Sequence, residues 1–478
     1  MYREGKGLRC RICMGCGLCP GVRAESLKIS ESRGGAETLY VLTDSPFNGE
    51  ASAGKADADG GKVTAGPFRE KDAVSVRELS EASRQGIRLV TADVGTTTAA
   101  MLLYGKDGAV EDRYVALNPQ AEYGADVISR IRAAEDKEKA ADMRKKLREV
   151  LEQGLERFQK RLAAHEHLRM ALAANTTMTY FLMGWDTSEL GRAPFRASRL
   201  GSVETVIGDV PCFIFPGISA FVGGDIVAGM YASGMGDREE ITLLIDLGTN
   251  GELALGNRNR RVACATAAGP AFEGGANRGV WGADMISRLA ALKRAGLLDE
   301  TGLLAEAYFE SGIRVGNVHV TQQGVRAVQL AKGAIAAGIE VLLERYGVRA
   351  EQVDRVILAG GFGYYLKPED AVEIGLLCPE LAKKAMAGGN TALSGALRAG
   401  AWLLARQESG GMAGGISRNG EALPGSSRRE GQADVLTQEL AGLVSGTEVL
   451  NLAEEPDFEK RYTEAINLQT PIDNLIRR

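Results

Sequence analysis

Short apolar runs and one long amphipathic stretch dominate the middle of the chain. Five runs of mainly aliphatic and β-branched residues have the length of buried strands. They are 87–93, 99–104, 241–246, 253–255 and 355–359. Between residues 131 and 171, apolar side chains recur every three or four positions within a charged background, which predicts a helix with one buried face. We interpret its charged positions as a solvated face and not as a binding patch.

Two other segments lack this pattern. Residues 22–86 have few long apolar runs, with a strand-like piece at 38–43 and a tract rich in Gly, Ala and Asp at 51–66. We expect a mostly flexible tether there, carrying at most a small hairpin. Residues 408–432 are rich in Gly and Ser and predict a disordered insertion near the end of the chain.

Length and composition narrow the class of protein. A chain of 478 residues exceeds one ordinary domain, so we expect two or three folded units. The hydrophobic share of 45% and the charged share of 25% are globular values. A net charge of −5 gives no reason to expect a nucleic-acid partner or an anionic membrane surface.

The sequence also bears on the compartment. The most apolar stretch, 210–230, is interrupted by Pro211, Pro216 and Asp225, so we predict no transmembrane helix. The first ten residues have no apolar segment of the kind that a secretion signal needs. We therefore expect a cytoplasmic protein.

Four of the seven cysteines, Cys10, Cys13, Cys16 and Cys19, stand within ten residues. Steps of three residues leave little chain for disulfide loops, but they let successive thiolates surround one iron–sulfur cluster. The bacterial ferredoxin run C-x2-C-x2-C-x3-C-P differs from this motif only in its last gap. We favour a [4Fe-4S] cluster, with a structural zinc site and free or redox-active thiols as alternatives. The remaining cysteines are expected to be buried apolar residues; they are Cys212, Cys264 and Cys378.

One pattern occurs twice along the chain. The run 87–93 ends in Asp93, followed by Val-Gly-Thr-Thr-Thr and a second apolar run, while the run 241–246 ends in Asp246, followed by Leu-Gly-Thr-Asn-Gly-Glu and another. A glycine in a tight hairpin lets backbone N–H groups approach an anion, and an aspartate at a strand end offers a hard oxygen to Mg²⁺ or its waters. Two such hairpins facing each other would clamp one polyphosphate.

A third glycine turn completes the set. The run 355–359 leads into Gly360-Gly-Phe-Gly, which suits the close approach of a flat adenosine. Each turn alone is weak evidence, whereas the three in this order are strong evidence. Neither GxxxxGK[ST] nor a GxGxxG that opens a helix after a strand is found in the sequence.

The order of these turns resembles the superfamily of acetate and sugar kinases, heat-shock chaperone ATPases and actin, whose two ribonuclease-H-like lobes close on ATP. More narrowly, the amino-acid sequences of seven segments are similar to segments of the reductive activators of corrinoid-dependent enzymes. These segments are ADVGTTTAA (92–100), NPQAEYGADVISRI (118–131), ANTTM (174–178), LIDLGTNGELALGN (244–257), AAGPAFEGG (267–275), QLAKGAIAAGI (329–339) and LAGGFGYYL (358–366). The resemblance runs from about residue 89 to 405 and resumes near residue 449.

The resemblance implies an α/β protein with the two ribonuclease-H-like lobes of the actin-like ATPase fold, behind a small iron–sulfur motif and a flexible tether. It divides the chain into a four-cysteine motif at 1–22, a tether at 23–86, a first lobe at 87–238 and a second lobe at 239–478. Members of the family commonly carry an N-terminal [2Fe-2S] ferredoxin domain, in whose place this chain has only the four-cysteine motif.

The resemblance also implies roles for individual residues. Asp93 and Asp246 would organise Mg²⁺. Glu273, a catalytic candidate beside them, would position water or contact a partner, or else would be a hydrogen-bonded turn residue. The same choice holds for Asp225, and Asn175 is a candidate for the lining of the cleft. The phosphates would be held by Gly95, Thr96, Thr97, Gly248, Thr249 and Asn250, and the adenosine by Lys332, Gly360, Gly361 and Phe362.

The implied activity is an ATP-hydrolysing reductive activation. A corrinoid protein of a methyltransferase system would be returned from Co(II) to Co(I) by an electron from the cluster, which a low-potential donor such as a ferredoxin would reload. A homodimer is left open. Three rival interpretations are a small-molecule kinase of the same superfamily, an activator of 2-hydroxyacyl-CoA dehydratases and a nucleotide-switched protein that assembles a metal centre.

Overall fold

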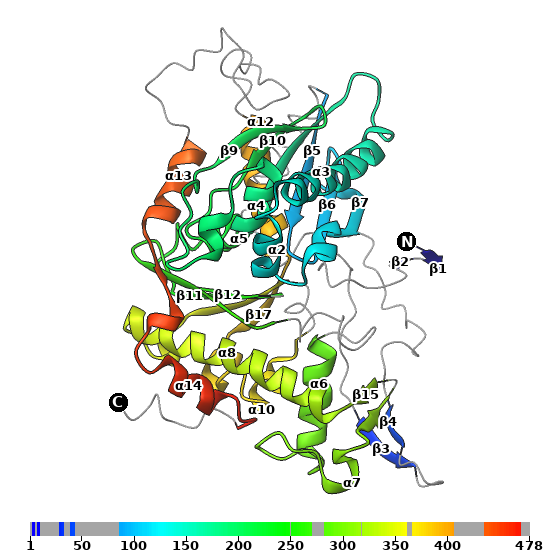
Figure 1. Ribbon diagram of the computed structural model, residues 1–478, viewed down its shortest axis with the longest axis vertical. Coiled ribbons are helices and arrows are strands. Elements are labelled where there is room, and N and C mark those ends of the chain that lie inside the picture. Colours follow the sequence, from blue (N-terminus) through cyan, green and yellow to red (C-terminus); the bar gives the residue numbers. More distant parts are fainter. Residues whose placement is uncertain are drawn as a thin grey trace.

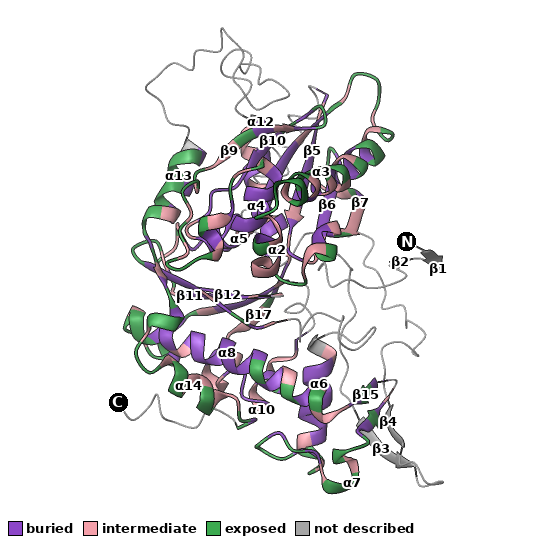
Figure 2. Cartoon of the chain, viewed as in Figure 1, coloured by how far each residue is buried: buried purple, intermediate pink, exposed green. Residues whose placement is uncertain are grey.

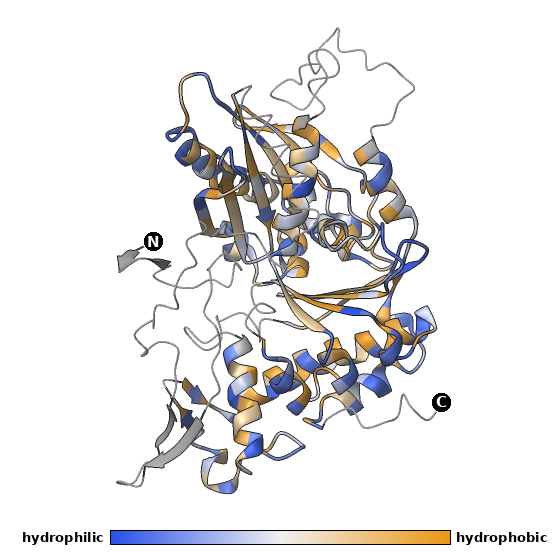
Figure 3. Cartoon of the chain, turned by 180° about the vertical axis from the view of Figure 1, so that it is seen from behind, coloured by the Kyte–Doolittle hydropathy of each residue, from blue (hydrophilic) through white to orange (hydrophobic). Residues whose placement is uncertain are grey.

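The computed structural model describes residues 86–248, 250–269, 282–316, 318–360, 366–405 and 435–469, together with four short strands before residue 86. Two six-stranded sheets make up the body and lie one above the other in Figure 1. The central strands of both sheets are buried, as Figure 2 shows, and rich in hydrophobic residues, as Figure 3 shows. Among the residues described, none of the helices combines the length and the hydropathy that a membrane crossing requires.

The first sheet has the strand order β7-β6-β5-β8-β10-β9. Strands β5, β6 and β7 form an antiparallel meander, β8 pairs in parallel with β5, and β10 pairs in parallel with β8. The edge strand β9 is antiparallel to β10. The bounds are β5 Ile87–Val94, β6 Thr98–Tyr104, β7 Val110–Leu117, β8 His167–Ala174, β9 Val203–Ile207 and β10 Val210–Ile214.

The second sheet repeats this plan in the order β17-β16-β11-β12-β13-β18. Its strands β11, β12 and β13 form the meander, and β16 pairs in parallel with β11. The bounds are β11 Thr242–Leu247, β12 Gly251–Gly256, β13 Arg261–Thr266, β16 Arg355–Ala359, β17 Ala385–Gly389 and β18 Thr447–Leu450. Because β5 and β11 hold the same place in their sheets, the predicted internal repeat is confirmed as a structural repeat.

The helix predicted over 131–171 is only partly correct. The structure has α2 at Val127–Ala133 and α3 at Lys137–Gln159, and the carboxylate of Asp136 caps the start of α3 by accepting from the N–H groups of Glu138 and Lys139. Residues 167–174 form β8 instead, where the backbone pairs with β5 and β10 and most of the side chains are buried. Within α3, the buried side chains repeat at helical spacing; they are Met143, Leu147, Leu151, Leu155 and Phe158. Truncating one of them to alanine would cost about 2–5 kcal/mol of the free energy of unfolding.

Further helices lie along both sheets. In the first half of the chain they are η1 Pro119–Tyr123, α4 Thr176–Met183, η2 Ser188–Gly191 and α5 Gly224–Ser233. In the second half they are α6 Gly282–Arg294, α7 Glu306–Phe309, α8 Gln322–Tyr346, η4 Ala350–Gln352, α10 Pro368–Glu373, α11 Pro379–Ala382, α12 Thr391–Ala405, α13 Val435–Ser445, η6 Leu452–Glu454 and α14 Phe458–Ala465. Helix α12 follows β17 of the second sheet but packs against β5, β8 and α5 of the first. The chain therefore returns to the first sheet after completing most of the second.

Two smaller elements involve the N-terminal strands. Strands β1 Tyr2–Glu4 and β2 Gly7–Arg9 form an antiparallel hairpin, as do β3 Lys28–Ser32 and β4 Leu39–Thr43. Strand β4 pairs with β14 Ile313–Val315, which pairs in turn with β15 Val318–Val320. The hairpin allowed for in the tether thus belongs to a four-stranded sheet with residues of the second half. The rest of the tether and the insertion predicted at 408–432 lie outside the described residues.

Candidate functional site

The first repeated turn is held from behind by the segment 118–131. In the turn, the N–H of Gly95 donates to the carbonyl of Thr98 at 2.8 Å. The buried side chain of Asn118 donates from Nδ2 to the carbonyl of Gly95 at 3.0 Å, and the buried guanidinium of Arg130 donates from Nη1 to the carbonyl of Thr96 at 2.7 Å. These contacts fix the carbonyl side of the turn, so an anion would meet its N–H side.

The second turn follows β11 in the same way. Asp246 is the penultimate residue of β11, and the N–H of Gly248 donates to the carbonyl of Asn250 at 3.0 Å. Across the hairpin, Asp246 stands in register with Glu252, which is 8% exposed. The turn thus brings a second carboxylate next to the one that the repeat predicted.

Among the described residues, the packing does not require glycine at either of the two turns. Neither Gly95 nor Gly248 has a positive φ, and an added Cβ would meet only the carbonyl oxygen of Thr98 at 3.4 Å or of Asn250 at 3.7 Å, which are ordinary contacts. Because nothing in the described protein occupies this room, it is available to a ligand that approaches the backbone. The two turns therefore fit phosphate groups.

Gly360 is constrained more strongly. It lies directly after β16 with a φ of 79°, and an added Cβ would stand 2.5 Å from the carbonyl oxygen of Leu247 and 2.6 Å from Oδ1 of Asp246. A side chain at this position would be strained by the backbone and would press on the carboxylate. The third predicted turn is therefore in direct contact with the second.

Four carboxylates from both halves of the chain influence one another electrostatically. Burial raises the pKa of Asp93 to about 6, against an opposing hydrogen bond from Asn390. Burial and the charge of Asp93 raise the pKa of Asp225 to about 7. Burial and the charges of Asp225 and Asp93 raise the pKa of Asp246 to about 8. Burial and the charges of Asp225 and Asp246 hold the pKa of Glu252 well above its usual range.

This donor set fits a divalent cation. Crowded carboxylates resist ionisation, and a bound divalent cation would offset their mutual repulsion. In the described ranges, no group of three His, Cys, Asp or Glu side chains is close enough to hold a metal ion without other ligands. In nucleotide sites Mg²⁺ commonly keeps several waters and is bound by phosphate oxygens with only one or two carboxylates.

Two amides complete the surroundings of the first turn. Asn175 caps the start of α4, since its Oδ1 accepts from the N–H of Met178 at 2.9 Å, and its Nδ2 donates to Oγ1 of Thr96 at 3.3 Å. Asn390, at the start of α12, donates from Nδ2 to Oδ2 of Asp93 at 2.7 Å. Asn175 thus lies beside the first turn.

Several residues of this site were not predicted. Asn118, Arg130, Glu252 and Asn390 were not singled out from the sequence. The first two fall inside the conspicuous segment 118–131, so that motif was a usable signal. Glu252 could have been found from the two-residue period of β12, but no local pattern marks Asn390 as a partner of Asp93, 297 residues away.

The structure places Lys332 differently from the turn residues. It is a fully buried residue of α8, and its Nζ donates to the carbonyl of Asn467. Burial, with the nearby charge of Lys293, lowers its pKa to about 7. Among the described residues, Lys332 is thus hydrogen-bonded to the C-terminal segment and not to the two turns. Other predicted site residues lie outside the described residues; they are Thr249, Glu273, Gly361, Phe362, Cys10, Cys13, Cys16 and Cys19.

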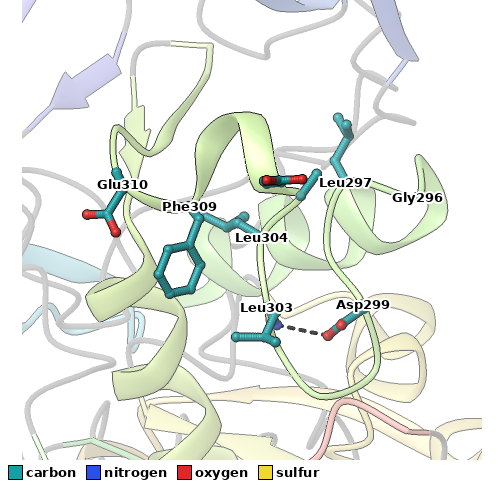
Figure 4. A pocket seen from close by; sticks show the side chains of 9 residues that line it. Gly296, Leu297, Asp299, Leu303, Leu304, Phe309 and Glu310 are labelled. Carbon is teal, nitrogen blue, oxygen red and sulfur yellow. Dashed lines mark hydrogen bonds between the residues drawn. The ribbon is translucent and has the colours of Figure 1, made fainter.

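A surface pocket of about 560 Å³ lies apart from the carboxylates. Figure 4 shows it beside α7, where Leu303, Leu304 and Phe309 line it together with Asp299 and Glu310. Oδ1 of Asp299 accepts from the N–H of Leu303 at 2.8 Å, which closes the loop below the pocket. None of the described residues predicted for the nucleotide site lines it.

Comparisons with known proteins agree with the repeat and the motifs. Residues 89–238 match the RACo middle region, and residues 240–284 and 275–413 match the C-terminal domain of RACo, the ASKHA domain. The chain is 28% identical over 389 residues to the corrinoid activation enzyme RamQ of Eubacterium limosum, which covers 67% of this chain and 65% of that protein. It is 25% identical over 241 residues to the [Co(II) methylated amine-specific corrinoid protein] reductase of Methanosarcina barkeri, covering 40% of this chain and 44% of that protein. The chain thus spans less than two thirds of the length of either curated relative.

The fold has a counterpart among solved structures. A structure described as a reductive activator for corrinoid,iron-sulfur protein superposes with a TM-score of 0.67 and 27% identity, over 82% of this chain and 68% of that chain. The prediction of two lobes of the actin-like ATPase fold is therefore confirmed. From residue 89 to residue 413 this chain belongs to the RACo family of reductive activators of corrinoid proteins, and its second half is that family's ASKHA domain.

Proposed function

We propose that this chain binds Mg²⁺ and ATP between its two repeated turns and uses ATP hydrolysis to drive the one-electron reduction of a partner corrinoid protein from Co(II) to Co(I). The electron would pass through a [4Fe-4S] cluster bound by Cys10, Cys13, Cys16 and Cys19. The observation that carries the nucleotide half of the proposal is the group of four carboxylates beside two glycine turns with unfilled room. The names of the two relatives support the corrinoid half.

The turns provide groups for the triphosphate. Backbone N–H groups and the hydroxyls of Thr96 and Thr97 would contact phosphate oxygens from one side, and Asn250 from the other. Mg²⁺, when bound, would neutralise part of the phosphate charge and lower the barrier to attack on the γ-phosphate. Asn118 and Arg130 keep the first turn in shape by holding its carbonyls.

A water molecule could be oriented by Asp225. This residue lies in the first turn of α5, and its own Oδ1 accepts from the N–H of Ile226 at 2.9 Å. A carboxylate with a pKa near 7 is suited to accept a proton from an attacking water at neutral pH. Glu273, which the sequence also suggested for this role, remains a second candidate.

The cysteine motif suits a reducible cluster by its chemistry. Four thiolates within ten residues are the donor set that a cubane requires. A low-potential donor such as a ferredoxin would reload it, and the corrinoid would belong to the partner protein. Delivery to cobalt is uphill by roughly 200 mV, or about 5 kcal/mol for one electron, which hydrolysis of the nucleotide can offset.

The proposal is tested by separating its two halves. Asp246→Asn should lower the kcat/KM of ATP hydrolysis by about 100-fold, since a carboxylate that would hold Mg²⁺ or its waters is lost. The double variant Cys13→Ala/Cys16→Ala should retain hydrolysis but no longer reduce a purified Co(II) corrinoid protein. Reduction is followed by electron paramagnetic resonance, because Co(II) is paramagnetic and Co(I) is not.

Two outcomes would contradict the proposal. If the wild-type protein binds no Mg²⁺-nucleotide in a calorimeter, the nucleotide half fails. If the cysteine variant activates the corrinoid protein at the wild-type rate, the electron does not pass through the motif. Cys378→Ala, which replaces a cysteine outside the motif, serves as the matched control.

A further inference from the structure

Asn390 occupies the junction between the two sheets. It follows β17, the edge strand of the second sheet, and precedes α12, which packs on the first. Just before it, Gly389 has a φ of 65°, and a Cβ at Gly388 would lie 2.5 Å from the side chain of Ile357 in β16. The strand before the junction is thus fixed to the second sheet.

Helix α12 is fixed equally closely to the first sheet. A Cβ at Gly395 would stand 2.2 Å from the carbonyl oxygen of Ala228 in α5, and one at Gly400 would stand 2.6 Å from Cδ1 of Leu89 in β5. Such close approach leaves α12 no room to slide against these elements. A change in the angle between the two sheets must therefore be absorbed at residues 388–390 or at the other crossings of the chain.

The side chain of Asn390 makes a hydrogen bond with each of its two polar atoms. Its Oδ1 accepts from the N–H of Leu393 at 2.8 Å and so caps α12, while its Nδ2 donates to Oδ2 of Asp93 at 2.7 Å. An amide can do both at once. A carboxylate of the same shape would cap the helix but repel Asp93, and serine would cap it without reaching the carboxylate.

We propose that Asn390 is a positioning residue, which orients the carboxylate of Asp93 toward the cation of the nucleotide and ties that carboxylate to the junction at 388–390. The inference rests on the proposed nucleotide site and adds to it a link between the site and the angle of the lobes. With one oxygen of Asp93 engaged by Asn390, the other is left to face the ion or its waters. Partners that orient a cation-binding group typically contribute 10- to 100-fold to its affinity.

The test compares nucleotide binding with and without Mg²⁺. Affinities of ADP and of a non-hydrolysable ATP analogue are measured by calorimetry, in Mg²⁺ and in EDTA, for the wild-type protein and for Asn390→Ala, Asn390→Asp and Asn390→Ser. We expect the gain in affinity from Mg²⁺ to fall by at least about 10-fold in all three variants. Affinity in EDTA should change little.

The serine and aspartate variants keep a cap on α12, so they separate positioning from helix stability. Asn257→Ala, at a turn of the second sheet where Oδ1 accepts from the N–H of Asn259, is the matched control and should bind as the wild type does. If the three variants lose affinity equally in Mg²⁺ and in EDTA, or lose none, Asn390 has no positioning role. If the wild-type protein binds no nucleotide under either condition, the proposed function fails and not this inference alone.

Discussion

The room above the two glycine turns yields the sharpest prediction. Gly95→Ala adds one methyl group, which would lie 3.4 Å from the carbonyl oxygen of Thr98, and the backbone there has no positive φ. The folded state can therefore accept the methyl group. Because alanine restricts the unfolded chain, we expect the free energy of unfolding to stay unchanged or to rise by up to about 1 kcal/mol.

Nucleotide binding should respond in the opposite direction. The methyl group would occupy the space through which a phosphate oxygen approaches the N–H groups of the turn. Losing one hydrogen bond to a charged group costs about 1.5–3 kcal/mol, so the affinity for Mg²⁺-nucleotide should fall by about 10- to 100-fold. Gly248→Ala, with 3.7 Å to the carbonyl oxygen of Asn250, should behave in the same way.

The assay pairs calorimetric titration with thermal unfolding of the same samples. Gly442→Ala in α13 is the control, since an added Cβ there meets nothing within 4 Å and the residue is remote from the turns in sequence. A folded Gly95→Ala protein that binds nucleotide as tightly as the wild type would refute the placement of the phosphates at this turn.

Three further changes test the packing around the site and in the lobes. Gly360→Ala should lower the free energy of unfolding by about 1–3 kcal/mol, because its Cβ would lie 2.5 Å from the carbonyl oxygen of Leu247; urea unfolding measures this. Burial raises the pKa of Asp112, but hydrogen bonds from Arg157 outweigh it and hold that pKa below its usual range. The ionised carboxylate therefore stabilises the folded protein above about pH 4. This stabilisation is lost as the pH falls through the lowered pKa. Asp112→Asn should therefore be less stable than the wild type at pH 7 and nearly equal to it at pH 2–3 in urea titrations. Burial lowers the pKa of Lys332 to about 7. Between about pH 7 and pH 10 the unfolded chain therefore binds a proton that the folded protein does not bind. Lys332→Met should be more stable than the wild type at pH 6.5, and the difference in free energy of unfolding should narrow toward pH 10.

The order of strands and turns was predictable because it is local. Asp93 and Asp246 each end an apolar run of strand length and are followed by a glycine turn, and both facts are written in about ten consecutive residues. The structure bears out both hairpins, and Gly360 lies in contact with the second one. Local patterns of this kind also carried the resemblance to the family.

The helix prediction that failed and the site residue that was missed both depend on contacts between distant segments of the chain. The helix predicted over 131–171 includes most of His167–Ala174, and only the pairing of that segment with β5 and β10 makes it a strand. Likewise, the amphipathic pattern of Thr391–Ala405 does not say which sheet the helix covers. The bond from Asn390 to Asp93 follows from that choice of sheet, so it could not be predicted before the topology was known.

The free energy that the proposed electron transfer requires is larger than any single contact in the site can supply. Transferring one electron to an acceptor whose reduction potential is lower by roughly 200 mV requires about 5 kcal/mol. A bound nucleotide shifts the equilibrium between two lobe positions only by the difference between its affinities for them. A hydrogen bond to a charged group contributes about 1.5–3 kcal/mol, so the bond between Asn390 and Asp93 alone is too weak to account for the coupling. In the proposed function, the remainder would come from phosphate contacts at both turns, which lie on different sheets. Variants at Asn390 should therefore weaken the dependence of corrinoid reduction on ATP without abolishing it, whereas disabling either turn should abolish it.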